Sequence, residues 1–256
     1  MFTTIRSLKI SYEVLGEGEP ILLLHGWGGS LESMKALGSR LKDQGFKVIL
    51  VDLPGFGKSD KPREAFWLED YAQIIEEFLK QLEIENPVLF GHSFGGAISI
   101  KITTRKNVKV KKLILCNSSG IRLPKEKKQK VVGKVAKIVK AFARIPLLGR
   151  LYPYLRKFFY YYILGERDYI DHQEIAGTFE KVIVEDLTEQ LNIVDIPTLL
   201  LWGENDTSTP LAQGETMRLR IQNSKLKVYE GEGHGIPKFK PELVVKDIVE
   251  FISGSR

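Results

Sequence analysis

The chain has very little cysteine and no long apolar segment. Its 256 residues include one cysteine, Cys116, which excludes an internal disulfide and is typical of a reducing compartment. No apolar run reaches the roughly 18–20 residues that a membrane-spanning helix needs. Residues 1–6 also lack the basic and then apolar plan of a signal peptide. We therefore expect a cytoplasmic protein.

Two further classes of function lack support in the sequence. No cysteine–histidine cluster has the spacing of a metal site, so we expect neither a metal nor an organic cofactor. The net charge of +6 is modest, and no groove-entering motif accompanies the lysines, which argues against a nucleic-acid partner. The hydrophobic fraction of 43% and the charged fraction of 27% are ordinary for a soluble globular protein. As its partner we expect a small-molecule substrate.

Short apolar runs alternate with amphipathic stretches along the chain. A hairpin is predicted at 5–10 and 11–14, and strands at 21–24, 48–51, 88–90, 110–115, 198–202 and 225–229, of which those at 21–24, 48–51 and 110–115 are expected to be buried. Helices are predicted at 32–43, 67–82, 97–102, 210–220 and 241–252. This alternation predicts an α/β fold, with a mostly parallel central sheet flanked by helices. Ligands of such folds bind beyond the carboxyl ends of the strands.

Ser93 stands where a predicted strand turns directly into a predicted helix. Gly91 and Gly95 flank it, two residues away on each side, and small residues are needed there because the strand end and the first helical turn nearly touch. The helix N-terminus also favours developing negative charge. The pattern therefore predicts that Ser93 is a nucleophile.

A serine nucleophile needs a nearby base, itself oriented by a third group. Among the four histidines, His234 is the best base because it lies in a glycine-flanked loop after the last predicted strand. His92 adjoins Ser93, but neighbours in a tight turn point apart. For His25 we expect a structural hydrogen bond, and for His172 a position on the surface or the cap.

The orienting acid should also follow a strand end. Asp206 comes a short turn after the strand predicted at 198–202, and Glu204 is a rival whose alternative role is that of a solvated loop charge. The competing position, after the strand at 110–115, carries Asn117 instead of a carboxylate. The chain order of the predicted catalytic residues is then Ser93, Asp206, His234.

The oxyanion of a tetrahedral intermediate needs two preorganised N–H donors. We expect one from the backbone of Phe94, the residue after the nucleophile, and the other from Trp27 in the loop after the strand at 21–24. The side chains of Trp27 and Phe94 are expected to form pocket walls, with plain core packing as the alternative. For Asp52 we favour a structural role in the floor of its loop.

These motifs resemble those of the α/β-hydrolase superfamily. The matching stretches are His25-Gly26-Trp27-Gly28-Gly29, residues 52–59, residues 91–96, Asp206 and Gly233-His234. The likeness spans nearly the whole chain outside its middle segment, and it is specific for the fold and the triad but not for the substrate. Epoxide hydrolases and haloalkane dehalogenases of this fold carry Asp where this chain has Ser93.

The resemblance implies a helical cap at residues 121–189, inserted between core segments 1–120 and 190–256. A basic amphipathic helix is predicted at 127–140, followed by the aromatic run at 158–162. Its lysines form a solvated face, or they attract an anionic membrane surface or an acidic carrier protein. We expect Phe159 and Tyr161, together with Ile236, to contact an apolar acyl group.

The sequence thus predicts a serine hydrolase that cleaves carboxylic esters or thioesters of a small or medium apolar acyl group through an acyl-enzyme. The alternatives are a C–C bond hydrolase or an acyltransferase that uses the same triad. A non-catalytic binding module on the same fold is a third interpretation. The sequence predicts no oligomeric state.

Overall fold

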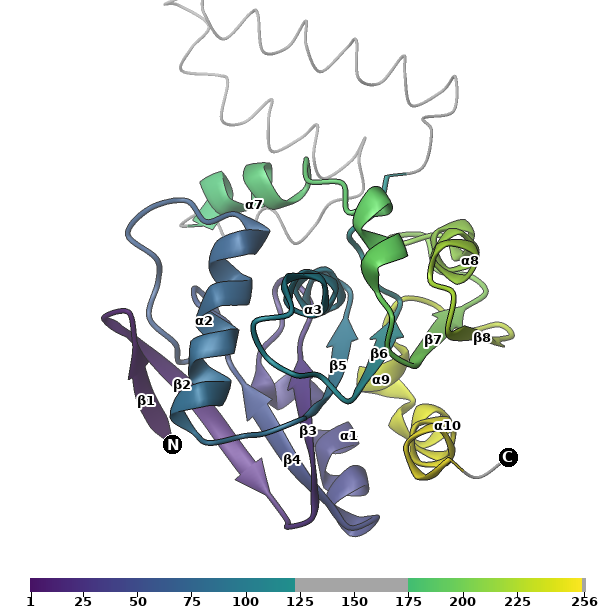
Figure 1. Ribbon diagram of the computed structural model, residues 1–256, viewed down its shortest axis with the longest axis horizontal. Coiled ribbons are helices and arrows are strands. Elements are labelled where there is room, and N and C mark those ends of the chain that lie inside the picture. The colour runs from purple at the N-terminus through teal and green to yellow at the C-terminus, as the bar shows by residue number, and fades with distance from the viewer. Residues whose placement is uncertain (123–174, 255–256) are drawn as a thin grey trace, which may run out of the picture.

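The computed structural model describes residues 1–122 and 175–254. Over these residues the chain forms an eight-stranded sheet of order β1-β2-β4-β3-β5-β6-β7-β8 (Figure 1). The strands are β1 Phe2–Ile5, β2 Leu8–Leu15, β3 Glu19–Leu24, β4 Phe46–Val51, β5 Val88–His92, β6 Lys112–Cys116, β7 Thr198–Gly203 and β8 Ser224–Tyr229. The pairs β1–β2 and β2–β4 are antiparallel, and all later pairs are parallel.

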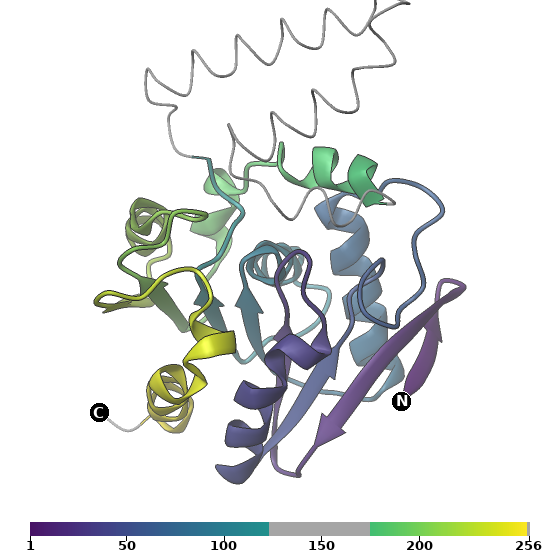
Figure 2. The same cartoon turned by 180° about the vertical axis from the view of Figure 1, so that it is seen from behind.

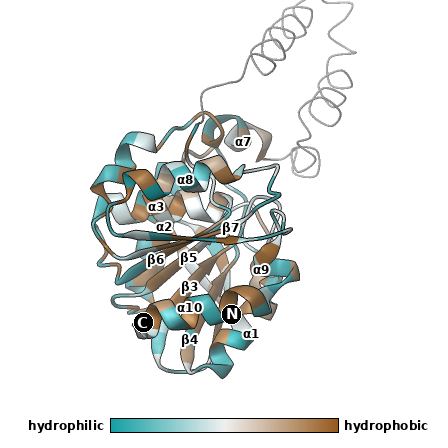
Figure 3. Cartoon of the chain, turned by 90° about the vertical axis from the view of Figure 1, so that its right-hand side faces the viewer, coloured by the Kyte–Doolittle hydropathy of each residue, from teal (hydrophilic) through white to brown (hydrophobic). Residues whose placement is uncertain are grey.

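Helices cover both faces of the sheet, as the alternating pattern predicts (Figure 3). They are α1 Leu31–Asp43, α2 Leu68–Gln81, α3 Phe94–Arg105, α7 Ala176–Val182, α8 Leu211–Arg220, α9 Ile236–Phe239 and α10 Pro241–Ser253, with the 3₁₀ helix η3 Thr188–Ile193. Helices α2, α3 and α8 pack on one face, while α1, α9 and α10 pack on the other (Figures 2 and 3). Across the described residues, no helix has the length and apolar content that crossing a bilayer requires.

The buried strands separate two apolar layers because successive side chains point to opposite faces. Along β3, Leu22 and Leu24 join the layer beneath α2 and α3, whereas Ile21 and Leu23 join the layer beneath α1 and α10. All four side chains are at most 1% exposed. The unbroken apolar runs that predict buried strands are therefore explained by burial on both faces.

The strand order reverses at β3. After β3 the chain crosses one face through α1 to reach β4, whereas β5, on the other side of β3, continues through α3 on the opposite face to β6. The two connections diverge and leave a crevice beyond the carboxyl ends of β3 and β5. The segments that begin at His25 and at Ser93 both lie at this point.

The N-terminal hairpin differs from the prediction. Its turn lies at Arg6 and Ser7, between β1 and β2, rather than between residues 10 and 11. Arg6 and Ser7 have φ values of 47° and 67°, the pair of positive angles that a two-residue hairpin turn requires. Asn-Gly or Asp-Gly is the usual sequence signal for such a turn, and Arg-Ser gives none.

The middle of the chain is described only at its two ends. The expected basic helix at 127–140 and the residues Phe159, Tyr161 and His172 lie outside the described residues. Helix α7 lies over α2, toward the carboxyl ends of the strands (Figure 1). The Leu187 amide donates to the Gly120 carbonyl at 2.7 Å, and this bond joins the two described ends of the segment.

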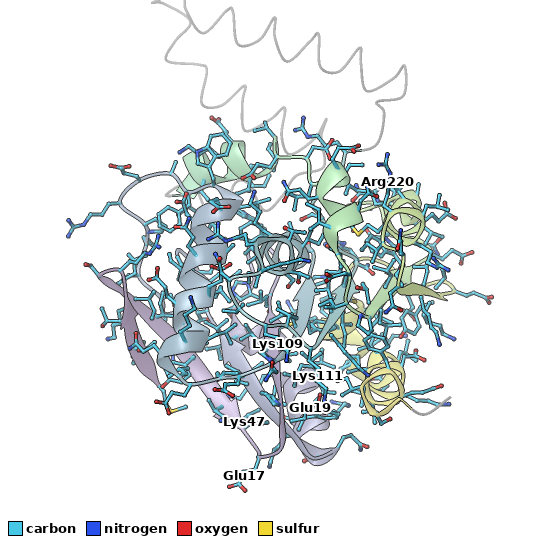
Figure 4. The ribbon with its side chains drawn as sticks, in the orientation of Figure 1. Glu17, Glu19, Lys47, Lys109, Lys111 and Arg220 are labelled. Carbon is cyan, nitrogen blue, oxygen red and sulfur yellow. The ribbon has the colours of Figure 1, made fainter. Side chains whose placement is uncertain are left out.

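Lys112 ties the sheet to the last helix. Its ammonium group donates to the carbonyls of Phe251 and Ile252, at 2.7 and 2.9 Å, in the final turn of α10. These carbonyls have no partner within the helix, and a cation there also complements the helix dipole. Its neighbour Lys111 instead pairs with Glu19 at 2.7 Å, with the Lys111 side chain 49% exposed (Figure 4).

We expect Lys112→Met to lower the free energy of unfolding by about 1–2 kcal/mol, because two charge-assisted hydrogen bonds are lost at a helix end. The matched variant Lys111→Met should cost less, at most about 1 kcal/mol, since it breaks a single half-exposed ion pair. Urea unfolding of both variants measures the difference. Equal losses would show that Lys112 contributes no more than a surface charge.

Candidate active site

Ser93 occupies a strained turn between β5 and α3. Its backbone angles are φ 51° and ψ −115°, a conformation that L-residues rarely adopt. A Cβ atom at Gly91 would lie 2.5 Å from the Gly95 carbonyl oxygen, and one at Gly95 would lie 2.3 Å from the oxygen of Leu24. Both positions therefore require glycine, for the steric reason that the sequence motif suggests.

Hydrogen bonds to β6 and its following loop hold this turn in place. The Ser93 amide donates to the Cys116 carbonyl at 3.1 Å, and the Ser93 carbonyl accepts from the Ser119 amide at 3.0 Å. The next loop residue before Ser119 also packs closely on the turn, because a Cβ atom at Gly96 would lie 2.1 Å from the Oγ atom of Ser118. This close packing keeps the strained backbone in one conformation.

Asp206 and His234 form a hydrogen-bonded pair on neighbouring loops. Asp206 follows β7, His234 follows β8, and the distance from Nδ1 of His234 to Oδ2 of Asp206 is 2.8 Å. The Asp206 side chain is fully buried, while that of His234 is 28% exposed. Because Nδ1 faces the carboxylate, Nε2 of His234 is left to accept a proton.

Three further donors satisfy the Asp206 carboxylate. Oδ1 accepts from the amides of Ser208 and Thr209, at 2.8 and 2.9 Å, and Oδ2 accepts from the Thr209 hydroxyl at 2.7 Å. Burial opposes ionisation of Asp206, but the hydrogen bonds from His234 and Thr209 outweigh it and hold the pKa of that carboxyl below its usual value. Asp206 is therefore ionised at neutral pH.

The rival acid, Glu204, lies away from this pair. It is exposed, and its carboxylate accepts from the Gly231 amide at 3.0 Å. Asn117, at the other position considered for an acid, donates to the Gly233 carbonyl at 2.9 Å and accepts from the Gly203 amide at 3.1 Å. Asn117, which follows β6, is therefore hydrogen-bonded to the end of β7 and to the loop after β8.

The remaining described histidines and Asp52 make structural contacts. The His25 ring lies 2.7 Å from the Gly26 carbonyl and accepts from the Leu53 amide at 3.1 Å, as a structural role requires. The Asp52 carboxylate accepts from the amides of Leu31 and Lys58, at 2.7 and 2.9 Å, and so fixes the start of α1 and its own loop. Nε2 of His92 lies 2.9 Å from the carbonyl of His234.

Sequence reasoning missed the contacts of Thr209, Asn117 and His92. The contacts of Asn117 and His92 join loops that are far apart in the chain, so no local pattern predicts them. A partial signal exists for Thr209, which stands three residues after Asp206, the spacing at which Asp caps the following backbone amides.

Ser93 and His234 line one cavity of about 620 Å³. Its apolar lining residues are Trp27, Leu68, Phe94, Ala97, Ile121, Phe179, Val182 and Ile183. Its other lining side chains include Ser119, Arg122, Glu185, Thr207, Ser208, Thr209 and Gln213. The cavity therefore takes its apolar lining mainly from α2, α3 and α7. Its polar lining comes from the loop between β7 and α8, from Gln213 of α8, and from Ser119, Arg122 and Glu185.

Trp27 and Phe94 meet at this cavity and pack in an aromatic cluster. The Trp27 ring contacts the rings of Phe56, Phe94 and Phe179 edge-on, with centroids 5.0–5.2 Å apart. Within residues 1–122 and 175–254, neither the Trp27 amide nor the Phe94 amide donates to a protein acceptor. Phe94 is the first residue of α3, where the helix leaves its N–H groups unpaired.

Ile236 does not reach the cavity. Its side chain is 2% exposed and belongs to the apolar layer that includes Met34, Val244 and Ile248, on the face covered by α1 and α10. This placement corrects the expectation that Ile236 contacts substrate, because the start of α9 carries the side chain into the core. The other two predicted acyl contacts, Phe159 and Tyr161, lie outside the described residues.

Comparison with known proteins identifies the family. The model of the α/β-hydrolase fold matches residues 19–161, and that of TAP-like proteins matches residues 180–253. The chain belongs to the α/β-hydrolase fold family. This membership supports a hydrolase as its class of enzyme.

Among the described residues, no group of three or more His, Cys, Asp or Glu side chains is arranged to hold a metal ion.

Relatives at modest identity cover nearly the whole chain. It is 29% identical to an AB hydrolase superfamily protein of Bacillus subtilis, YisY, over 97% of both chains. It is 27% identical to Lipase 1 of Psychrobacter immobilis, over 85% of this chain and 71% of the lipase. An esterase from Exiguobacterium antarcticum has a similar structure, with a TM-score of 0.77, 25% identity and coverage of 98% of both chains.

Burial of His92 predicts a pH-dependent stability. Burial, together with a smaller effect of His234, lowers the pKa of His92 from 6.5 to about 3. Between these values the unfolded chain binds a proton that the folded chain does not, so stability falls as the pH drops below about 6.5, by about 1.4 kcal/mol per pH unit.

We therefore expect wild type to lose about 2 kcal/mol more than His92→Gln when the pH is lowered from about 7.5 to about 5.0. Urea unfolding at the two pH values measures this difference, and the variant removes the titration without removing the polar group. An identical pH dependence of the two proteins would contradict the assignment of a neutral, buried His92.

Proposed function

We propose that the chain is a serine hydrolase that cleaves carboxylic esters or thioesters through an acyl-enzyme. One observation carries the proposal. Ser93, on its strained turn, shares a cavity with His234, and the Nδ1 atom of His234 is hydrogen-bonded to the buried Asp206 carboxylate. This combination of nucleophile, base and orienting acid is the arrangement that acyl transfer through serine requires.

Each residue then has a defined task. Ser93 Oγ attacks the carbonyl carbon of the substrate, and its proton passes to Nε2 of His234. Asp206 holds the imidazole in the tautomer with hydrogen on Nδ1 and stabilises the imidazolium that forms. His234 gives the proton to the departing alcohol or thiol. Water then attacks the acyl-enzyme and gives a proton to His234, the bond between the acyl carbon and Ser93 Oγ breaks, and His234 returns the proton to Oγ as the acid leaves.

The amides of Phe94 and Trp27 form the proposed oxyanion hole. The carbonyl oxygen becomes negatively charged when Ser93 attacks, and preorganised N–H donors stabilise it. The Phe94 amide also lies at the N-terminus of α3, where the helix dipole favours negative charge. The lack of protein acceptors for these two amides among the described residues supports this role.

The cavity supports an apolar acyl group of small or medium size. Its volume of about 620 Å³ lies within the usual range for small-molecule sites. Phe94, Phe179 and Val182 offer an apolar wall for the acyl chain. The Thr207 to Thr209 loop offers polar groups for the part of the substrate beyond the carbonyl group. The names of an esterase and a lipase among the similar proteins agree with ester cleavage.

Several further expectations remain part of the proposal. They are a helical cap at 121–189, with Phe159 and Tyr161 against the acyl group, and a cytoplasmic location. The last expectation is a weak contact of the basic segment at 127–140 with an anionic membrane or an acidic carrier protein. The C–C bond hydrolase, the acyltransferase and the binding module are treated as alternative outcomes of the experiment below.

Labelling with a fluorophosphonate probe tests the proposal, together with hydrolysis of p-nitrophenyl esters of graded acyl length. We expect wild type to be labelled at Ser93 and to hydrolyse short and medium esters. Ser93→Ala should lose labelling and at least about 10³-fold in kcat, because the nucleophile is gone. Ser208→Ala, which changes another serine of the cavity wall, should still be labelled.

Three other outcomes would favour a different reaction, a binding module or a different nucleophile. Labelling at Ser93 without ester turnover would keep the nucleophile and favour thioesters, C–C bonds or an acyl acceptor other than water. Absence of labelling in wild type would contradict the proposal and favour a binding module. Turnover that persists in Ser93→Ala would exclude Ser93 as the nucleophile.

A further inference from the structure

Two side chains from other strands hold the backbone around His234. Nε2 of His92 lies 2.9 Å from the His234 carbonyl, and Nδ2 of Asn117 lies 2.9 Å from the Gly233 carbonyl. Carbonyl oxygens only accept, so both side chains donate. The two carbonyls belong to the peptide groups on either side of the His234 α-carbon. The bonds therefore fix the point from which the imidazole departs.

We propose that His92 and Asn117 are positioning residues that hold His234 in register with Ser93 and Asp206. This inference rests on the proposed function, in which His234 is the base. The need for such a hold follows from the sequence of the loop, because Gly231, Gly233 and Gly235 leave its backbone with wide conformational freedom. His92 and Asn117 restrict that freedom at His234.

His92 is itself held firmly enough for this task. It ends β5, where it pairs with Cys116 of β6, and it is 9% exposed. Its ring lies against the His234 ring, with centroids 4.9 Å apart. A Cβ atom at Gly26 would approach its Nδ1 atom to 3.0 Å, so the glycine loop packs closely on the ring.

Asn117 is fixed at both ends of its amide. Its oxygen accepts from the Gly203 amide at 3.1 Å, and this bond directs the amide nitrogen to the Gly233 carbonyl. The side chain is fully buried, and the backbone has a φ value of 46°, which Asn and Asp tolerate better than most residues. The end of β7 also constrains the loop, because a Cβ atom at Gly203 would lie 2.5 Å from the Gly233 oxygen.

A pair of variants that differ by one methylene group tests the role of His92. The amide nitrogen of Gln can reach the position of Nε2, whereas that of Asn falls short of it. We expect His92→Asn to lower kcat by about 10- to 100-fold, because a displacement of roughly 1 Å at a catalytic group has an effect of this size. KM should change less than about twofold, and His92→Gln should restore kcat to within about threefold of wild type.

Asn117→Gly provides a second test. Glycine tolerates the backbone φ value of 46° and removes the donor to the Gly233 carbonyl, and it places no charge near His234. We expect a loss of kcat similar to that in His92→Asn. This variant also serves if His92→Asn fails to fold, as judged by circular dichroism.

Proton NMR of protein with ¹⁵N-labelled histidine gives a readout that is independent of turnover. The Nδ1–H signal of His234, hydrogen-bonded to Asp206, should be sharp in wild type and His92→Gln. It should be broadened or lost in His92→Asn and Asn117→Gly. An unchanged signal in both of these variants would overturn the inference. This NMR pattern in a wild type that is neither labelled by the fluorophosphonate nor active on esters would support the positioning role and reject the proposed hydrolysis.

Discussion

The strained turn at Ser93 is the constraint on which the rest of the site depends. A residue with φ 51° and ψ −115° costs of the order of 1–3 kcal/mol, and it persists only where its surroundings leave no alternative. Here the surroundings are the close approach of Gly91 to Gly95, the contact of Gly95 with the Leu24 carbonyl, and hydrogen bonds to Cys116 and Ser119. The fold therefore holds the serine at the mouth of the crevice between β3 and β5.

The site is assembled from the carboxyl ends of five neighbouring strands. β3 brings Trp27, β5 brings His92 and Ser93, β6 brings Asn117, β7 brings the loop of Asp206, and β8 brings the loop of His234. The order of these strands in the sheet follows their order in the chain. Loops that follow one another along the sheet can therefore exchange hydrogen bonds, as those of Asn117, Asp206 and His234 do.

The sequence predicts the parts of this arrangement that depend on local patterns. Buried strands have unbroken apolar runs, and the turn at Ser93 needs its glycines, so the sheet and the position of each loop could be predicted. The Asp206–His234 contact follows from the parallel order of β7 and β8 once both loops are known to leave the same edge.

The features that were missed depend on tertiary contacts or on turns without a sequence signal. His92 points away from Ser93, as a tight turn predicts, and this direction takes its ring to the His234 carbonyl, which no local pattern indicates. The hairpin turn at Arg6 and Ser7 lacks the glycine that would indicate it. Ile236 is not a pocket residue, because α9 begins at Ile236 and turns the side chain into the core.

The central claim is that Ser93, His234 and the amides of Phe94 and Trp27 act on one reacting group. A crystal structure of the protein after reaction with a fluorophosphonate tests this most directly. The account predicts a bond from Ser93 Oγ to phosphorus, with the phosphoryl oxygen about 2.7–3.1 Å from both amide nitrogens. A phosphoryl oxygen turned away from the Phe94 and Trp27 amides, or a phosphorus atom on another side chain, would contradict it.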